Sequence, residues 1–529
     1  MSAILHPPHG PGGLSRRALL GGLGGLGAAA LAGCTPVARQ VGSGGHGRQG
    51  GSLVMAQAEE PNLPTLRQQN NSNTSWSRLV FNSLTQYDHR TYRPRPQLAT
   101  DWELTDGGRT VVLRLREDVT FHSGRPFGPR DVAENIAYQA DEDGAPGQLR
   151  SAAAAVADHS VTGRNEITLR LAHGITNFFD LCEIMMIVDH ESIAELESGE
   201  VINGTGPFAF AGYDPGIAMR FTRNPRYWLA GRPYLDEVEL HIDSQPQAIV
   251  ASLRSGQTDV AYALNGLSRL TVRDDDRLRL IEVDTRDAGY YVGCNVEQEP
   301  LGDKRVRQAI SWAVDRQKVL DMALQGIGSV TSVPWTPVSP AYSREAAGHY
   351  HQDLDRARSL LAEAGVSGAR LELAISGNEP GGVRSIAEIV LDGLRAVGLD
   401  ASITPLQPAE FQQRLGTATL PGLWINGHGF GQLNPATMLN GAYPFNAARN
   451  ASNFSDPTYL RLAEQVWTTS GQDAARAAYA EVTDFLLDQQ FVIDLVSSSV
   501  TYATTRALHG CAFTMFNYLV LDEAFLGEG

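Results

Sequence analysis

The chain has 529 residues, of which 42% are hydrophobic and 19% are charged, a composition typical of a globular protein of about three domains. This composition excludes disordered, collagen-like and small disulfide-rich chains. The 43 basic and 59 acidic residues give a net charge of −16, which argues against nucleic acid as a partner, since phosphate backbones are bound by basic surfaces.

The four cysteines lie far apart in the sequence. No CxxC pair and no Cys/His cluster with zinc spacing occurs, so we expect no structural metal site. A single disulfide among Cys182, Cys294 and Cys511 stays open, because spacing alone does not determine pairing.

The N-terminal segment has the features of an export signal. Arg16 and Arg17 precede a weakly apolar stretch, residues 18–32, which is too short and too rich in glycine to cross a bilayer and leads into Gly33 and Cys34. A flexible glycine-rich tail is the alternative. The segment resembles a twin-arginine signal with a lipobox, in which cleavage precedes the cysteine and lipids are attached to it. This resemblance implies a signal peptide at 1–33, a lipidated Cys34 with a flexible tether at 34–50, and a body anchored on the extracytoplasmic (periplasmic or extracellular) face of the cell membrane.

The remainder of the chain alternates predicted strands and helices. Apolar and polar residues alternate over 110–116 and 166–171, which predicts two half-buried strands, and a helix is expected at 131–140 behind Gly128-Pro129. Further predicted elements are helices over 303–324, 354–365 and 386–397 and a short strand over 401–404. This alternation predicts an α/β fold.

Four groups of residues stand out along this body. They are 98–102 with 111–116, 121–124 and 131–132; 204–208 with 223–228 and 231–236; 303–310 with 315–316; and 355–365. Most of these residues have a structural explanation: we expect Gly204 and Gly206 to permit close backbone approach, Tyr227 and Trp228 to pack, and the apolar face around Val306 to be core.

In their order and spacing, the four groups resemble the extracytoplasmic solute-binding proteins of the peptide/nickel class, family 5, of ABC importers. The resemblance implies a two-lobed, periplasmic-binding-protein-like α/β fold of the large type II, with an extra inserted subdomain and a two-strand hinge. Lobe I would comprise 51–90, 204–284 and 495–529, the inserted subdomain 91–203, and lobe II 285–494. The hinge would cross at 284–295 and return at 491–496.

The resemblance also implies a function. A monomeric, lipid-anchored binding protein would close its lobes around a peptide-like or other small polar solute and deliver it to an ABC permease with separate ATPase subunits. Such a protein is not an enzyme and needs no cofactor and no metal. The alternatives are a sensor or receptor built on the same lobes and a secreted hydrolase, although no GxSxG, HExxH or P-loop motif occurs.

Ligand contacts in this family come from the polar segment before the first helix and from a loop of the second lobe. Here the first segment is amide-rich and contributes Gln69, Asn70, Asn71 and Trp76, which suits a neutral polar ligand. A solvated loop is the alternative. The candidates at the hinge and in the second lobe are Tyr290, Trp424, Asn426, His428, Phe430 and Gly431.

Residues 427–435, GHGFGQLNP, match a pattern that in many peptide binders carries two acids, the first of which pairs with the free amino group of the peptide. In this chain Gly431 and Asn434 take the places of the acids, and no Asp or Glu occurs between Phe411 and Ser455. A buried ammonium needs a fixed negative charge, so we expect a ligand without an exposed ammonium, either neutral or an anion to which His428 can donate. A register error of one or two residues is the alternative, but it would not restore the charge.

Overall fold

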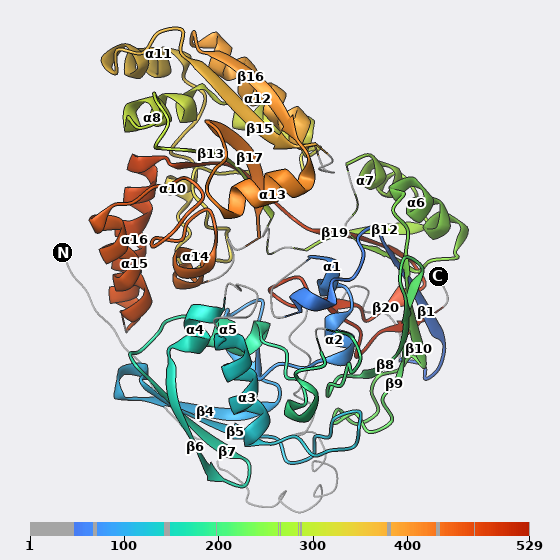
Figure 1. The fold of residues 1–529 in the computed structure, drawn as a ribbon. Coiled ribbons are helices and arrows are strands. Elements are labelled where there is room, and N and C mark those ends of the chain that lie inside the picture. Colours follow the sequence, from blue (N-terminus) through green and yellow to red (C-terminus); the bar gives the residue numbers. More distant parts are fainter. Residues whose placement is uncertain are drawn as a thin grey trace, which may run out of the picture. The chain divides into compact units, whose positions relative to one another are not determined.

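The computed structural model describes residues 47–66, 71–141, 149–196, 198–262, 264, 266–283, 285, 288–377, 382–429, 434–469 and 471–527 (Figure 1). All of these lie in one compact unit, Val37–Gly529. Three larger β-sheets, of seven, four and six strands, organise the described residues, and helices and hydrophobic cores pack against them.

The first sheet has seven strands and is built around β1. Its order is β12 (Leu278–Glu282), β19 (Thr501–Thr505), β11 (Val260–Tyr262), β1 (Ser52–Gln57), β10 (Glu237–Ile242), β9 (Ala218–Arg223) and β8 (Phe208–Asp214). β1 runs parallel to β10 and β11, and the other pairs are antiparallel. Helices α6 (Pro246–Ser255) and α7 (Gly266–Arg273) cover its β11, β12 and β19 end, and α2 (Ser77–Val80) lies against β8 (Figure 1).

Short elements complete this part of the chain. They are η1 (Leu63–Thr65), α1 (Asn71–Thr74), β20 (Leu508–His509), β21 (Ala512–Phe513), β22 (Leu519–Val520) and β23 (Phe525–Leu526). The core of this region joins residues from both ends of the chain, among them Leu53, Trp76 and Tyr502.

The second sheet is formed entirely by the inserted subdomain. Its antiparallel order is β4 (Ala99–Thr105), β5 (Thr110–Leu115), β7 (Glu166–Leu171) and β6 (Val156–Gly163). The remaining elements of the subdomain, and of the segment that leads into it, are β2 (Thr85–Tyr87), β3 (Pro94–Pro96), η2 (Asp106–Gly108), α3 (Pro129–Ala140), α4 (Arg150–Ala154), α5 (Phe178–Ile184) and η3 (His190–Ser192).

The third sheet, of six strands, belongs to the second lobe. Its order is β14 (Ser329–Val330), β18 (Val492–Ser498), β13 (Ala288–Cys294), β17 (Leu423–His428), β15 (Arg370–Ser376) and β16 (Asp400–Leu406). One core contains residues of α8 (Lys304–Ala313), α11 (Leu354–Glu363) and α12 (Val383–Ala396). The other contains residues of α13 (Pro408–Gly416), α14 (Pro435–Gly441), α15 (Pro457–Thr468) and α16 (Gln472–Gln489). Shorter helical segments are α9 (Arg316–Lys318), the π-helical η4 (Val319–Ala323) and α10 (Arg344–Ala347).

The chain passes twice between the seven-stranded and six-stranded sheets. The first passage lies between β12 and β13, and the return lies between β18 and β19. β18 stays in the six-stranded sheet as far as Ser498, which pairs with Ala288, so the return occurs at Ser499 and Val500 rather than at 491–496. A strand continues for as long as its neighbour offers hydrogen bonds, and the sequence of β18 does not show where its partner stops.

Local patterns predict most of the elements they cover. The strands β5, β7 and β16 and the helices α3, α11 and α12 are confirmed, with ends within three residues of those expected. The helix expected over 303–324 is wrong as a single element, because Val314 is extended and interrupts it. The Asp315 side chain then accepts from the Lys318 N–H and begins a new helical turn.

Residues of two of the groups singled out in the sequence, 204–236 and 303–316, have structural roles. A Cβ at Gly204 would lie 2.1 Å from the Val80 carbonyl oxygen, so only glycine allows this close approach. Tyr227 is buried and donates to the Asp522 carboxylate over 3.0 Å, and Trp228 donates from Nε1 to Asn82 over 3.0 Å. Val306 is fully buried in the core.

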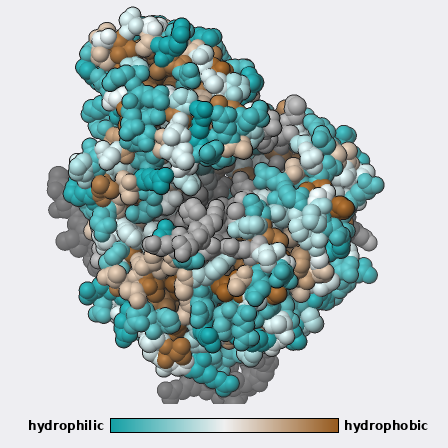
Figure 2. Space-filling view, in the orientation of Figure 1, coloured by the Kyte–Doolittle hydropathy of each residue, from teal (hydrophilic) through white to brown (hydrophobic). Residues whose placement is uncertain are grey.

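Cys182, Cys294 and Cys511 are free thiols buried in three different cores, which answers the question that their spacing left open. The face drawn in Figure 2 is mostly hydrophilic, and its hydrophobic residues form small separate patches. Within the described ranges, no helix has both the length and the apolar composition needed to cross a bilayer.

Candidate functional site

Four of the predicted hinge and second-lobe contacts, Tyr290, Trp424, Asn426 and His428, lie on two neighbouring strands beside the hinge. In the β13–β17 ladder, Tyr290 lies opposite Gly427, and His428 lies opposite Gly289. Because side chains alternate along a strand, Trp424, Asn426 and His428 share one face of the sheet, and Tyr290 points to the other. Tyr290 packs against the core that contains α8 and α12, so the ladder brings the three other residues together without it.

His428 is 8% exposed and lies over a buried acid. Its Nε2 is 3.5 Å from Oδ1 of Asp494, and its ring lies 5.5 Å from that of Phe445 and 5.8 Å from that of Tyr291. Burial raises the pKa of Asp494, although the nearby His428 opposes the shift. Gly289 makes room for the imidazole, since a Cβ there would be 2.7 Å from Nε2.

Both predicted tryptophans are core residues in this structure. Trp76 is fully buried, its ring stacks at 6.1 Å from that of Phe221, and its Nε1 donates to Asn73 Oδ1 over 3.3 Å. Trp424 is fully buried in the core that contains α13 to α16. Neither offers surface to a ligand here.

The other predicted contact residues are described in part or not at all. Asn426 is half-buried beside Tyr291, and Asn71 begins α1, with its side chain outside what is described. The remaining candidates, Gln69, Asn70, Phe430, Gly431 and the lipidation residue Cys34, lie outside the described residues.

A polar cluster that the sequence did not suggest joins the inserted subdomain to the second lobe. We call Thr176, Asn177, Asp180, Asn434 and Thr437 the interlobe cluster. Asn434 Nδ2 donates to the Thr176 carbonyl over 3.1 Å, and Asn177 Nδ2 donates to the Thr437 hydroxyl over 2.9 Å. Asp180 Oδ2 accepts from the Asn434 backbone N–H over 3.0 Å and from the Thr437 hydroxyl over 2.8 Å.

Two members of the interlobe cluster, Asn434 and Asp180, lie at helix starts. Asn434 caps α14 through its side chain, which accepts from the Ala436 N–H, and Pro435 follows as the first helical residue. Asp180 lies in the first turn of α5. The Asn-Pro pair is a helix-start signal readable from sequence, but the partners of Asn434 more than 250 residues away are not.

Asp180 is the electrostatic centre of the cluster. It is 2% exposed, and burial raises the pKa of its carboxyl from 3.8 to about 6, although donors from Thr437, Tyr87 and Asn434 oppose the shift. Tyr87 donates its hydroxyl to Oδ1 over 2.9 Å. Glu183, one turn later on α5, is also buried, and burial raises its pKa to about 8.

A cavity of about 800 Å³ lies beside the interlobe cluster. Its walls come from the inserted subdomain and the segment that leads into it, from the second lobe, and from the C-terminal segment. The lining residues are 87, 91–93, 104, 107, 108, 174–176, 178–180, 337–340, 434, 468, 469, 471, 475, 476, 479, 515 and 516. Its size is that of a pocket for a small organic molecule.

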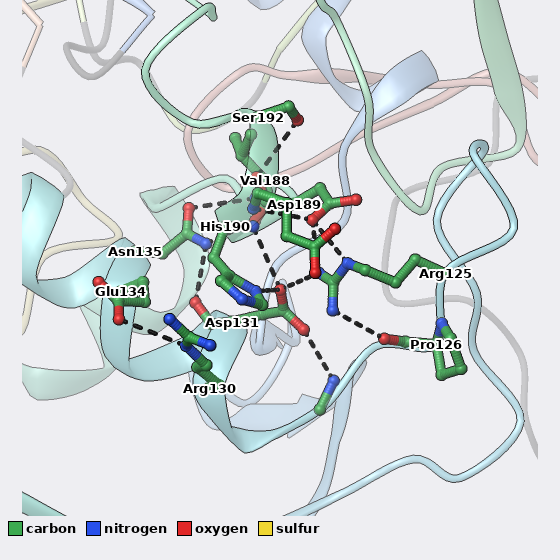
Figure 3. A network of polar contacts seen from close by, with 12 residues as sticks. Arg125, Pro126, Arg130, Asp131, Glu134, Asn135, Val188, Asp189, His190 and Ser192 are labelled. Atoms are coloured by element: carbon green, nitrogen blue, oxygen red, sulfur yellow. Dashed lines mark hydrogen bonds and ion pairs between the residues drawn. The ribbon is translucent and has the colours of Figure 1, made fainter.

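A second polar network lies inside the inserted subdomain (Figure 3). Asp131, Asp189 and His190 have ligand atoms close enough to hold a metal, but the Arg125 guanidinium already bridges the two carboxylates. His190 Nδ1 lies 2.7 Å from Asp131 Oδ1, and the Gly128 N–H donates to Asp131 Oδ2 over 2.9 Å. Burial alone would lower the pKa of Arg125, but its bonds to the two aspartates raise it. The network fixes the start of α3 to the 188–190 segment.

Comparison with known proteins identifies the architecture. Residues 93–457 match the family described as bacterial extracellular solute-binding proteins, family 5 Middle. The chain belongs to family 5 of the bacterial extracellular solute-binding proteins. The expected α/β fold of the periplasmic-binding-protein type is confirmed by the sheets and helices described above and by the similarity to solved binding proteins.

Curated relatives of this family 5 protein include the oligopeptide-binding protein AppA of Bacillus subtilis, 26% identical over 68% of this chain and 69% of that protein. Di/tripeptide-binding protein 1 of Pseudomonas aeruginosa is 24% identical over 85% of this chain and 89% of its own. Among solved structures, AgaA of A. tumefaciens R10, in complex with agropinic acid, is similar in fold, with a TM-score of 0.77, 20% identity and coverage of 90% of this chain and 99% of its own. These relatives are named as binding proteins.

Proposed function

We propose that this family 5 protein captures a peptide-like or other small polar solute between its lobes and delivers it to an ABC permease. The described strands place two chain passages between the lobes, and a cavity of about 800 Å³ lies between the inserted subdomain and the second lobe; these observations carry the proposal. Such a connection permits rotation of one lobe against the other. The names of the relatives support peptides as the default ligand, and agropinic acid in AgaA supports a wider range.

Closure around a solute removes water from the contact region, which strengthens each polar interaction with the ligand. It also creates a surface that exists only when both lobes meet, and a permease can distinguish that surface from the open form. The interlobe cluster supports this role, because its hydrogen bonds join the two moving parts and must break when they separate.

We expect the protein to act as a monomer outside the cytoplasm, held to the membrane by lipid on Cys34. Cell fractionation checks the anchor: we expect the wild type in the membrane fraction and Cys34→Ala in the soluble fraction. Membrane retention of the variant after a high-salt wash contradicts it.

Native mass spectrometry of the Cys34→Ala chain, purified from its own host, tests capture. We expect a bound solute that is released by denaturation, and a decrease in the radius of gyration by X-ray scattering when the emptied protein is refilled. A protein that neither retains a solute nor changes its radius with the host's small-molecule extract contradicts the proposed function.

The ligand should lack a free ammonium. We expect dissociation constants above about 100 μM for simple di- to pentapeptides with free amino termini, because Gly431 stands where an acid would meet the charge. Calorimetry with free and N-acetylated peptides measures this. Sub-micromolar binding of any free-amine peptide contradicts the expectation.

A further inference from the structure

The cavity beside the interlobe cluster has walls suited to aromatic or apolar groups. Phe178 and Phe516 are buried at 2% and 1% exposure, and Tyr87 and Phe179 are half-buried beside them. The rings of Tyr87 and Phe516 meet edge to face at 6.1 Å, and those of Phe178 and Phe179 at 5.6 Å. Such surfaces recognise a flat or branched apolar body rather than a strongly hydrated one.

The charges on the cavity wall are unequal. Two arginines, Arg93 and Arg476, line it, and Asp180 is the single acid among the lining residues. Arg476 is 67% exposed, and its ion pair with the fully exposed Asp473, at 3.9 Å, is weak. The lining residues thus carry two cations and one carboxyl group.

Asp180 does not offset these cations for a ligand. Its carboxylate already accepts three hydrogen bonds, from the Tyr87 hydroxyl, the Thr437 hydroxyl and the Asn434 N–H. A carboxylate has about four acceptor sites, so the three donors leave about one of them for an incoming ammonium, inside a buried site where a charge is costly to desolvate. The wall therefore favours a negative group and disfavours a positive one.

We propose that this cavity binds an organic carboxylate with an aromatic or apolar body and no free ammonium. The proposal rests on the proposed function and narrows its substrate class. The carboxylate pairs with Arg93 and Arg476 at the rim, and the apolar body enters between the aromatic rings. Because both the inserted subdomain and the second lobe supply walls, an occupied cavity favours the arrangement in which the interlobe cluster is formed.

Three dipeptide probes separate charge from shape on the full chain carrying Cys34→Ala. They are N-acetyl-Phe-Phe, a carboxylate; N-acetyl-Phe-Phe-amide, which is neutral; and Phe-Phe-amide, a cation. By calorimetry we expect the carboxylate to bind at least tenfold more tightly than either amide. Equal affinities overturn the proposal.

Charge variants locate the binding. The double variant Arg93→Gln/Arg476→Gln should weaken binding of the carboxylate probe at least tenfold and leave binding of the neutral amide unchanged. The control is Arg461→Gln, at an exposed arginine on α15 that does not line the cavity, and it should change the affinity of neither probe. Leu104 lines the cavity and is 42% exposed, so Leu104→Glu places a negative charge at the rim and should also weaken binding of the carboxylate probe. Its matched control is Val161→Glu, at 59% exposure on the same sheet. Carboxylate binding that survives both cavity changes overturns the assignment.

The outcomes also separate this proposal from the proposed function. If the protein retains a host solute but binds every probe with a dissociation constant above about 1 mM, the proposed function stands and the proposed specificity of this cavity is overturned. A protein that retains no solute and binds no probe contradicts both.

Discussion

Replacing Asp180 by asparagine should remove a pH dependence from the stability of this protein. The carboxyl is 2% exposed between α5 and α14, and burial raises its pKa to about 6. Between pH 4 and pH 6 the folded chain therefore holds a proton on Asp180 that the unfolded chain has lost. Stability from this group is present below pH 4 and is lost as the pH rises through 6.

The magnitude follows from the two pKa values. A change from 3.8 to about 6 corresponds to about 3 kcal/mol in total, of which about 2 kcal/mol falls between pH 4 and pH 7. Asparagine cannot ionise, and its amide N–H₂ replaces one carboxylate oxygen: in place of Oδ1 it meets the Tyr87 hydroxyl, and in place of Oδ2 it meets the Asn434 N–H and the Thr437 hydroxyl. The resulting loss of a hydrogen bond is about 1–3 kcal/mol and does not vary with pH.

Urea unfolding at pH 4, 5, 6 and 7 measures the effect. We expect the stability of the wild type minus that of Asp180→Asn to fall by about 2 kcal/mol between pH 4 and pH 7. Asp158→Asn, at a 64% exposed carboxylate of the same subdomain, controls for the loss of one negative charge. Parallel curves for the wild type and Asp180→Asn would refute the reasoning that burial of this carboxylate controls its titration.

Three further outcomes are expected. Asn71→Ala should weaken binding of the co-purified solute at least tenfold and leave the melting temperature of the empty protein unchanged. Asn73→Ala is the control: its side chain bonds Asn62 and Trp76, so this variant should lower the melting temperature. Unchanged solute affinity in Asn71→Ala would remove Asn71 from the site. Gly204→Ala should destabilise the fold by about 1–3 kcal/mol in urea unfolding, because its Cβ meets the Val80 carbonyl at 2.1 Å, and wild-type stability would contradict this close approach. The three buried cysteines should resist a thiol reagent until the protein unfolds, since burial raises their pKa values; rapid labelling of the folded protein would show that they are accessible.

The sequence by itself determined the local elements and the family. Alternation of apolar and polar residues is a local property, and it placed β5 and β7 correctly because each strand has one buried face. Helix starts are equally local: Asp353 caps α11 by accepting from the Arg356 N–H, three residues away. The order and spacing of the motif groups resemble family 5, and that resemblance implied the two-lobed architecture.

Only the tertiary structure decided which of the candidate residues face one another. Trp76 and Trp424 have the chemistry of ligand contacts, yet both became core residues, because burial depends on what packs over a side chain rather than on its type. Asp180 and Thr437 are 257 residues apart and meet through one hydrogen bond of 2.8 Å. No local pattern records such a contact: the free energy that forms it comes from the packing of two separate cores, and the carboxylate acquires its raised pKa only when that packing removes water from around it.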